Sequence, residues 1–491
     1  MRRSGGPGLV PGPRTVPSQA PGGPGLVPGH RTVPSQAPGG PGLVPGHRAH
    51  RWVIAAILAV ALVAVGGLAP RWSRHSAGPA ATAGRAATDP AAVARPAILT
   101  GTLVQQVASL QERLRTVPGD WQSWALLGLA YVQQARITAD PRYYPKAQGA
   151  LARSLAIRSG GNFDAAVGEG ALALARHDFT GGLRWGERAR RINPYDANVY
   201  GVIGDAQIEL GRYRQAFRTF QHMVDLHPEV SSYARASYAL ELQGDVPAAI
   251  KAMRMALLAA GTPEDRAFAA YQLGELFFST GRVASAARFY REAAALAPEY
   301  APPHAALAKV AWARGDTRRA IRRYTAVVRR FPLPEYVIAL GDLQQLAGLT
   351  TAAARSYSLV RVEERLFRAA GVNVDLELAL FDADHGRPRE ALVAARAEWH
   401  RRHSILVADA LGWALHRVGR DPEALRYARF AQKLGYRSAQ ISFHAGMIEL
   451  GLGDRVAARG DLERALSINP HFSILQSPVA SRALSRLERP R

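Results

Sequence analysis

The sequence predicts an all-α protein built from consecutive helical hairpins, and three observations predict this fold class. Eight glycines recur every 33 to 38 residues between positions 211 and 453. An alanine stands five residues after each of these glycines, and a small residue stands seven residues before each one. A register that is kept over eight units indicates a repeat array, in which each unit is one supersecondary element.

Each glycine is predicted to end the first helix of a hairpin, because a left-handed C-cap carries no steric penalty without a Cβ. The small residues and alanines allow close helix approach, and larger apolar residues four positions after most of the alanines fill the seam. The glycines are Gly211, Gly244, Gly281, Gly315, Gly348, Gly386, Gly419 and Gly453. The alanines are Ala216, Ala249, Ala286, Ala320, Ala353, Ala391, Ala424 and Ala458.

The packing residues of these units resemble the tetratricopeptide repeat family. The resemblance rests on Tyr200-x-x-Ile203-Gly204, Ala216-x-x-x-Phe220 and Pro228, and on Trp124-x-x-Leu127-Gly128-x-x-Tyr131. It implies a right-handed α-α superhelical solenoid of about ten units over residues 121–472. We expect an N-capping helix at 99–120 and a C-terminal capping helix at 473–491, since the ends of an array must be covered.

The N-terminal part has a different organisation. Residues 1–51 contain tandem copies of a 17-residue Pro/Gly-rich segment and predict a disordered tail, either passive or a polyproline-type recognition element. Residues 52–69 predict a transmembrane helix, because 17 consecutive residues from Trp52 to Leu68 carry no charge. Residues 70–98 are rich in Ala, Pro and Gly and predict a flexible linker.

The flanks of the apolar segment predict a single-pass cell-membrane protein. Six arginines and no acid precede the segment, which favours a cytoplasmic N-terminus and places the repeat array on the extracytoplasmic side. A cleaved signal peptide is the alternative, but Pro70 would follow the cleavage point after Ala69, which is unfavourable. A retained anchor is therefore the favoured interpretation.

The net charge of +23 does not by itself indicate nucleic acid as a partner. Only four of the 62 basic residues are lysines, a bias that a GC-rich bacterial genome produces whatever the function. Arg318, Arg319, Arg322, Arg323, Arg329 and Arg330 belong to a predicted second helix. In the family that the units resemble, second helices form the outer face and first helices line a concave groove.

The groove register places acids and aromatic residues inward. These positions predict a protein-binding scaffold for a peptide or a helical partner, since aromatic anchors in a concave surface suit such ligands. The predicted groove residues are Asp205, Glu209, Tyr238, Glu241, Tyr271, Glu275, Phe278, Trp312, Asp342, Trp413 and His416. The alternative is that the acids are solvated and the aromatic side chains belong partly to the core.

The sequence contains no catalytic or cofactor-binding motif, so we expect neither an enzyme nor a bound cofactor. The competing function is a metal- or small-ligand-handling accessory protein that uses Asp382, Asp384 and His385. Acids and histidines at helix ends are more often caps, and a metal needs three or four converging ligands. We therefore expect no metal site. The partner, the pathway and the oligomeric state have no signature in the sequence.

Overall fold

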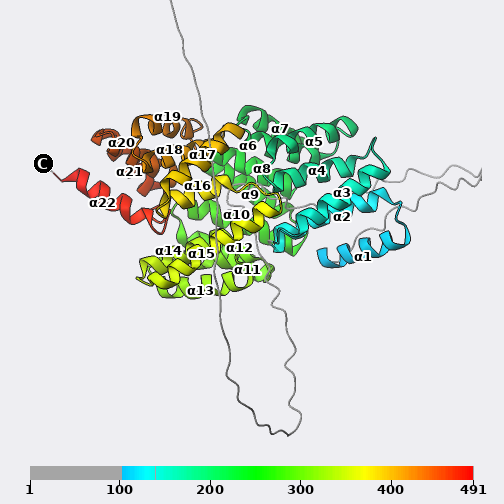
Figure 1. Ribbon diagram of the computed structural model, residues 1–491, viewed down its shortest axis with the longest axis horizontal. Helices are drawn as coiled ribbons and strands as arrows, with labels where there is room; N and C mark the ends of the chain where they lie inside the picture. Colours follow the sequence, from blue (N-terminus) through cyan, green and yellow to red (C-terminus); the bar gives the residue numbers. More distant parts are fainter. Residues whose placement is uncertain (1–101, 139, 490–491) are drawn as a thin grey trace, which may run out of the picture. The chain divides into compact units, whose positions relative to one another are not determined.

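The computed structural model describes residues 102–138 and 140–489, where every regular element is a helix (Figure 1). The first eleven are α1 (Leu103–Thr116), α2 (Trp121–Thr138), α3 (Tyr143–Ile157), α4 (Phe163–Ala175), α5 (Phe179–Ile192), α6 (Ala197–Glu209), α7 (Tyr213–Leu226), α8 (Val230–Leu242), α9 (Val246–Ala259), α10 (Pro263–Ser279) and α11 (Val283–Leu296). The others are α12 (Ala301–Ala313), α13 (Thr317–Arg330), α14 (Pro334–Leu346), α15 (Thr350–Ala369), α16 (Asp375–Asp384), α17 (Pro388–Arg401), α18 (Ile405–Arg417), α19 (Asp421–Ala431), α20 (Ala439–Gly451), α21 (Arg455–Ile468) and α22 (Gln476–Glu488).

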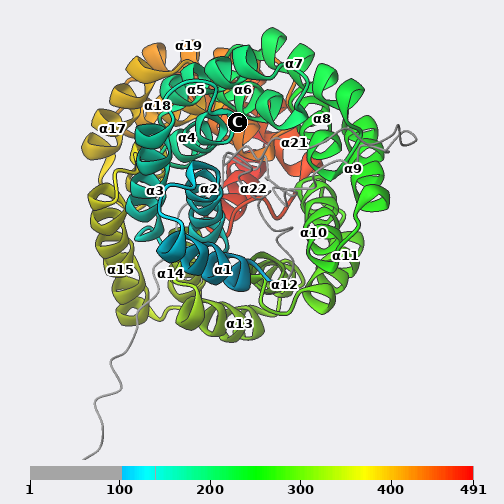
Figure 2. The same ribbon diagram turned by 90° about the vertical axis from the view of Figure 1, so that its right-hand side faces the viewer.

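The helices from α2 to α21 form ten consecutive hairpins, which is the repeat array that the sequence predicts. The first helix of each hairpin packs on the second, and successive hairpins stack. Between α14–α15 and α16–α17 this contact is made by side chains such as Val337, Val360 and Phe381. Figure 2 shows α10, α12 and α14 on the inside of the curve and α11, α13 and α15 on the outside. At the ends, α1 packs on α2 through Leu110 and Leu114, and α22 packs on α21.

The eight glycines of the repeat register all adopt the left-handed conformation, with φ between 73° and 84°. The residue after each glycine closes the helix end; for example, the Arg212 N–H donates to the Gln207 carbonyl at 2.8 Å. This is the hydrogen bond of a Schellman cap. The corresponding position of the hairpin α4–α5 is His177, with a φ of 61°, which explains why the glycine register begins only in the next unit.

The small residues of the first helices make room for large side chains of the second helices. A Cβ on Gly204 would meet the ring of Phe220 at 2.2 Å, and one on Gly274 would meet the ring of Tyr290 at 2.3 Å. Ala216 and Ala286 are fully buried in the same seams. The small residue and the alanine are therefore packing requirements of each hairpin.

Segments about 190 residues apart in the sequence contact each other, so one superhelical turn packs against the next. The Asn373 N–H donates to the Arg176 carbonyl at 3.1 Å, and His177 Nδ1 lies 2.6 Å from the Asn373 carbonyl oxygen. Further along the array, the Asn469 side-chain amide donates to the Phe278 carbonyl at 3.0 Å. We call this set of contacts the turn-to-turn interface.

Three of the register glycines also form part of the turn-to-turn interface. A Cβ on Gly211 would meet the carbonyl oxygen of His403 at 2.3 Å, and one on Gly244 would meet that of Gly435 at 2.4 Å. A Cβ on Gly281 would lie 3.2 Å from the carbonyl oxygen of Ile468. Gly315 and Gly348 occupy the same position in their hairpins, but a Cβ on either would meet no atom within 4 Å.

The predicted tail, membrane helix and linker, residues 1–98, lie outside the described residues. Within 102–138 and 140–489, no helix has the length and apolar character needed to cross a membrane.

Candidate functional site

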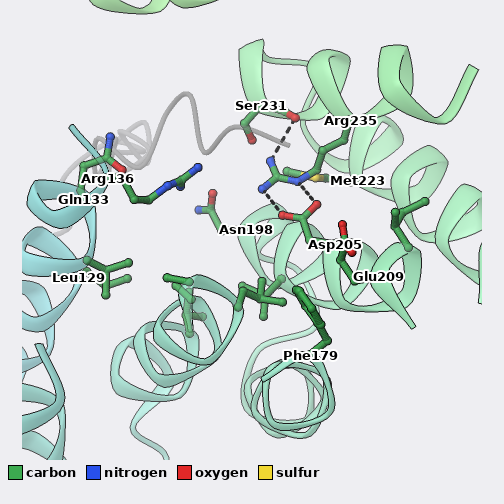
Figure 3. A pocket seen from close by; sticks show the side chains of 17 residues that line it. Leu129, Gln133, Arg136, Phe179, Asn198, Asp205, Glu209, Met223, Ser231 and Arg235 are labelled. Carbon is green, nitrogen blue, oxygen red and sulfur yellow. Dashed lines mark hydrogen bonds and ion pairs between the residues drawn. The ribbon is translucent and has the colours of Figure 1, made fainter. Parts of the chain in front are cut away.

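Two cavities formed by the described residues border the inner helices of the array. The first, which we call the N-terminal pocket, has a volume of about 70 Å³ and is lined mainly by α2, α4, α6 and α8 (Figure 3). Asp205 in this pocket binds Arg235 through two hydrogen bonds of 2.9 and 2.8 Å. Burial raises the pKa of Asp205, and the adjacent Arg235 opposes that rise. Figure 3 shows Arg136 extending from α2 into the same space.

Glu209 also borders the N-terminal pocket but is buried in a network of charges. Its carboxylate pairs with Arg402, which pairs in turn with Glu398. The Arg402 guanidinium lies 4.5 Å from the ring centroid of Phe179. Glu209 therefore joins two superhelical turns, and its carboxylate is already neutralised within the protein.

The second cavity lies between α8 and α10 on one superhelical turn and α16, α18 and the start of α20 on the next; we call it the turn-to-turn cavity. Its volume is about 300 Å³, which is within the range of ligand pockets. The lining residues are Ala234, Ser237, Tyr238, Glu241, Met253, Gln272, Glu275, Leu276, Ser279, Leu376, Leu380, Leu406, Asp409, Tyr436, Ser438, Gln440 and Ile441. Three of the predicted groove residues, Tyr238, Glu241 and Glu275, thus come together.

The two glutamates of the turn-to-turn cavity differ in their surroundings. Glu275 accepts hydrogen bonds from the Lys309 ammonium at 2.9 Å and from the Tyr290 hydroxyl at 2.6 Å. The Glu241 carboxylate has no hydrogen-bond or ion-pair partner among the described residues. Burial, together with the charge of Glu275, raises the pKa of Glu241 to about 7. Glu241 is therefore the carboxylate without a counter-ion in this cavity.

Three other predicted groove residues lie along the inner helices, away from both cavities. Tyr271 is half-buried, with ring centroids of Tyr290 and Tyr300 each 5.9 Å away. The half-buried ring of Trp312 meets His471 edge-on, with 5.9 Å between centroids. Asp342 accepts a hydrogen bond of 2.9 Å from the Tyr357 hydroxyl.

Two predicted aromatic anchors, Phe278 and Trp413, are packed in the interior with 5% and 3% of their surface exposed. Trp413 stacks on His444, with ring centroids 4.2 Å apart, and its indole N–H donates to Asp384. His416 also stacks on Trp413, with ring centroids 5.0 Å apart, and its Nδ1 lies 2.6 Å from an Asp421 carboxylate oxygen. Phe278 and Trp413 therefore belong to the core, as the alternative interpretation of the aromatic residues proposed.

The residues of the competing metal hypothesis each have a protein partner. Asp382 pairs with Arg361, Asp384 accepts from Trp413 and Gln476, and His385 lies 2.9 Å from Asp342. Within the described residues, no group of three or more Asp, Glu or His side chains is arranged to hold a metal ion. This geometry does not support a metal site at Asp382, Asp384 and His385.

Several residues of the inner surface are missing from the predicted groove. Gln272, Tyr436 and Leu406 border the turn-to-turn cavity, and Arg402 pairs with Glu209 from 193 residues away. Gln272 occurs on the same helix as Glu275, three positions earlier, so its inward direction follows from the register of α10. The residues from the following superhelical turn follow from no local pattern.

The arginines of α13 lie on the opposite face of the hairpins. Arg318, Arg319, Arg322, Arg329 and Arg330 are exposed, and Arg323 is half-buried. The outer surface therefore carries a cluster of exposed arginines at this point of the array.

Two family models described as tetratricopeptide repeat match the chain, one over residues 277–343 and the other over 202–266 and 243–301. The chain is a tetratricopeptide repeat protein. The matched segments lie within the ten hairpins, which continue on both sides of them. No curated protein matches this tetratricopeptide repeat protein.

Solved structures that resemble this tetratricopeptide repeat protein share little sequence with it. The APC/C hetero-tetramer Cut9-Hcn1 is 14% identical over 78% of this chain and 81% of that one, with a TM-score of 0.37. Yeast Tom70 is 14% identical over 78% and 86%, with a TM-score of 0.30. Human IFIT1, solved as a dimer with PPP-AAAA, is 15% identical over 68% and 78%, with a TM-score of 0.43. These likenesses concern the fold alone.

Proposed function

We propose that this protein is a membrane-tethered scaffold that binds an extended or helical segment of a partner protein along the inner helices of the array. Tetratricopeptide repeat proteins generally mediate protein–protein interaction. The observation that carries the inner site is the turn-to-turn cavity, where an unpaired Glu241 and half-buried Tyr238 meet apolar walls. An aromatic and apolar pocket with a few polar groups is the usual composition of a binding hot spot.

The membrane tether is supported by the sequence of residues 52–69. An uncharged stretch of 17 residues with basic flanks is long enough to span a bilayer. The excess of arginine before it favours an array on the extracytoplasmic side. The proposed partner is then a protein that shares this compartment or this membrane.

Photo-crosslinking from the inner surface tests the proposed groove. We would place p-benzoylphenylalanine at Tyr271, half-buried on the inner helix α10, in the full-length protein in its native membrane. Tyr195, 83% exposed and between α5 and α6, is the matched control. We expect defined protein adducts from position 271 and none of the same size from position 195.

Two results would overturn the proposal. One is the absence of any protein adduct from position 271 when the tagged protein is crosslinked in cells. The other is the same adduct with equal yield from position 195, which would place the partner on the outer surface. Nuclease-sensitive adducts at exposed α13 positions such as Arg322 would instead indicate a nucleic-acid partner.

A further inference from the structure

The turn-to-turn cavity has an unbalanced set of charges. Three carboxylates, from Glu241, Glu275 and Asp409, line it, and its lining includes no Lys, Arg or His side chain. Two of the carboxylates already have hydrogen-bond partners behind the wall, and one of these partners is the Lys309 ammonium. Lys309 binds Glu275 at 2.9 Å, and His444 Nδ1 lies 2.9 Å from Asp409. The carboxylate of Glu241 remains without a partner within 102–138 and 140–489.

A second polar group in the cavity is also unpaired. Gln272 is only 8% exposed and lines the cavity, yet its side-chain amide has no hydrogen-bond partner among the described residues. This amide therefore has free hydrogen-bonding capacity toward a ligand in the cavity. The amide oxygen of Gln272 and the carboxylate of Glu241 are both acceptors, and a ligand with several N–H donors satisfies both.

The remaining walls suit an aliphatic chain that ends in a cation. Leu376, Leu380 and Leu406 supply an apolar wall from the second superhelical turn. The half-buried side chains of Tyr238 and Tyr436 border the same space, and aromatic rings attract a positive charge. Lys and Arg side chains combine such an apolar stem with a charged end. A bare metal ion fits less well, since no three acids or histidines within the described residues are placed to hold one.

We propose that the turn-to-turn cavity receives a Lys or Arg side chain of the partner protein, with its cationic end at Glu241 and Gln272. This inference rests on the proposed function and specifies the chemistry of the partner: a segment with a basic residue as its central anchor. Because α8 and α10 come from one superhelical turn and α16 and α18 from the next, the cavity exists only when the two turns are stacked.

Binding of blocked tripeptides to the full-length protein tests the inference. The probes are acetyl-Ala-Arg-Ala-amide, acetyl-Ala-Lys-Ala-amide and acetyl-Ala-citrulline-Ala-amide, and calorimetry or ligand-observed NMR gives the dissociation constants. Citrulline has nearly the shape of arginine without the charge. We expect the arginine or the lysine peptide to bind at least tenfold more tightly than the citrulline peptide.

Two variants assign the binding to this cavity. Glu241→Gln removes the charge and keeps the shape, and we expect it to abolish the preference for the basic peptides. Leu406→Trp fills the cavity and is expected to weaken the binding of all three peptides. Circular dichroism and the unfolding midpoint of this variant show whether the array is still folded. Glu449→Gln is the matched control, because Glu449 has a buried, unpartnered oxygen outside the cavity.

Equal affinity for the citrulline and basic peptides, or an unchanged preference in Glu241→Gln, would overturn the inference. Binding of spermidine without binding of either basic peptide would also overturn it, because the cation would then come from a small molecule. If position 271 crosslinks a partner while the basic peptides do not bind, only the proposed cation site is wrong. If the peptides bind through Glu241 while no protein is crosslinked, the proposed scaffold function fails and the cation site stands.

Discussion

The hydroxyl of Tyr213 on α7 accepts a hydrogen bond of 2.7 Å from the backbone N–H of Ile405, which begins α18 and lies 192 residues further along the chain. Both residues are buried, so this bond satisfies a donor at the start of a helix inside the turn-to-turn interface. It ties the third hairpin to the ninth. The energetics of the array therefore include contacts that nearest-neighbour stacking of repeats does not supply.

Replacement of Tyr213 by Phe tests the contribution of this bond. The variant leaves the Ile405 N–H buried without its acceptor, which typically costs about 1–3 kcal/mol. We expect the free energy of unfolding from urea titration to fall by that amount. Tyr195→Phe, at a tyrosine that is 83% exposed, is the control and is expected to leave stability unchanged. Equal stability of both variants would contradict a structural role for the Tyr213 hydroxyl.

Two glycine variants distinguish the energetic cost of a left-handed backbone from the cost of disturbing the turn-to-turn packing. Gly244 and Gly348 have φ values of 79° and 75°, so alanine at either position incurs the left-handed penalty of roughly 1–2 kcal/mol. Only at Gly244 would the new Cβ meet a backbone oxygen, that of Gly435 at 2.4 Å. We expect Gly244→Ala to cost about 1–3 kcal/mol more than Gly348→Ala, as overpacking does.

Chemical unfolding of the two glycine variants measures this difference. Small-angle scattering then shows whether Gly244→Ala separates the superhelical turns, which would lengthen the particle, while Gly348→Ala serves as the control for backbone strain. Identical stabilities and identical scattering would mean that the approach of Gly435 to Gly244 is not required for folding.

Glu363 on α15 is expected to make stability depend on pH. Its side chain is fully buried, neither carboxylate oxygen has a hydrogen-bond partner, and burial, together with the nearby Glu335, raises the pKa of Glu363 to about 9. The folded form holds a proton that the unfolded form, with a pKa of 4.5, releases. Its contribution to stability is therefore fully present below about pH 4.5 and is lost as pH rises towards 9.

Unfolding midpoints between pH 5 and pH 9 measure the contribution of Glu363. We expect Glu363→Gln to be more stable than the wild type at pH 8 and to flatten the pH dependence by at most about 1.4 kcal/mol per pH unit. Exposed Glu390 is the control, and Glu390→Gln is expected to retain the wild-type slope. A Glu363→Gln profile parallel to that of the wild type would show that Glu363 is ionised in the folded protein.

The proposed membrane tether is tested at residues 52–69. Replacing Leu58 and Val63 together by Arg places two charges in the apolar segment, at a cost of roughly 2.5–3.5 kcal/mol for each charge at the centre of a membrane helix. We expect the wild-type chain to remain in carbonate-washed membranes and the double variant to be released. Leu58→Ile with Val63→Leu is the control. Retention of the double Arg variant, or release of the wild type, would contradict the tether.

Protease treatment of sealed cells and of opened cells addresses the orientation in the same preparations. An array on the extracytoplasmic side is expected to be cleaved without opening the cytoplasmic membrane. Protection until that membrane is opened would place it in the cytoplasm and would limit the search for its partner to that compartment.

The hairpins were predictable because their packing is local and periodic. Gly204 and Phe220, which meet in one seam, are 16 positions apart, and equivalent pairs recur along the chain. The groove was predictable only in part. The register of the first helices identified Glu241 and Glu275 on the inner surface, but the same register also pointed to Phe278 and Trp413, which neighbouring side chains cover. A register defines the direction of a side chain, whereas its exposure depends on what packs beyond it.

The sequence by itself determined the helical hairpins, their left-handed glycine turns and the inward direction of the acids, because each depends on residues within one or two repeat units. Only the tertiary structure decided the stacking of superhelical turns, the Glu209–Arg402 pair and the cavity at Glu241. These features join positions about 190 residues apart, and they depend on the rotation that accumulates over several hairpins. A small change in the rotation per hairpin would move Arg402 away from Glu209. No local sequence pattern encodes the total rotation over several hairpins.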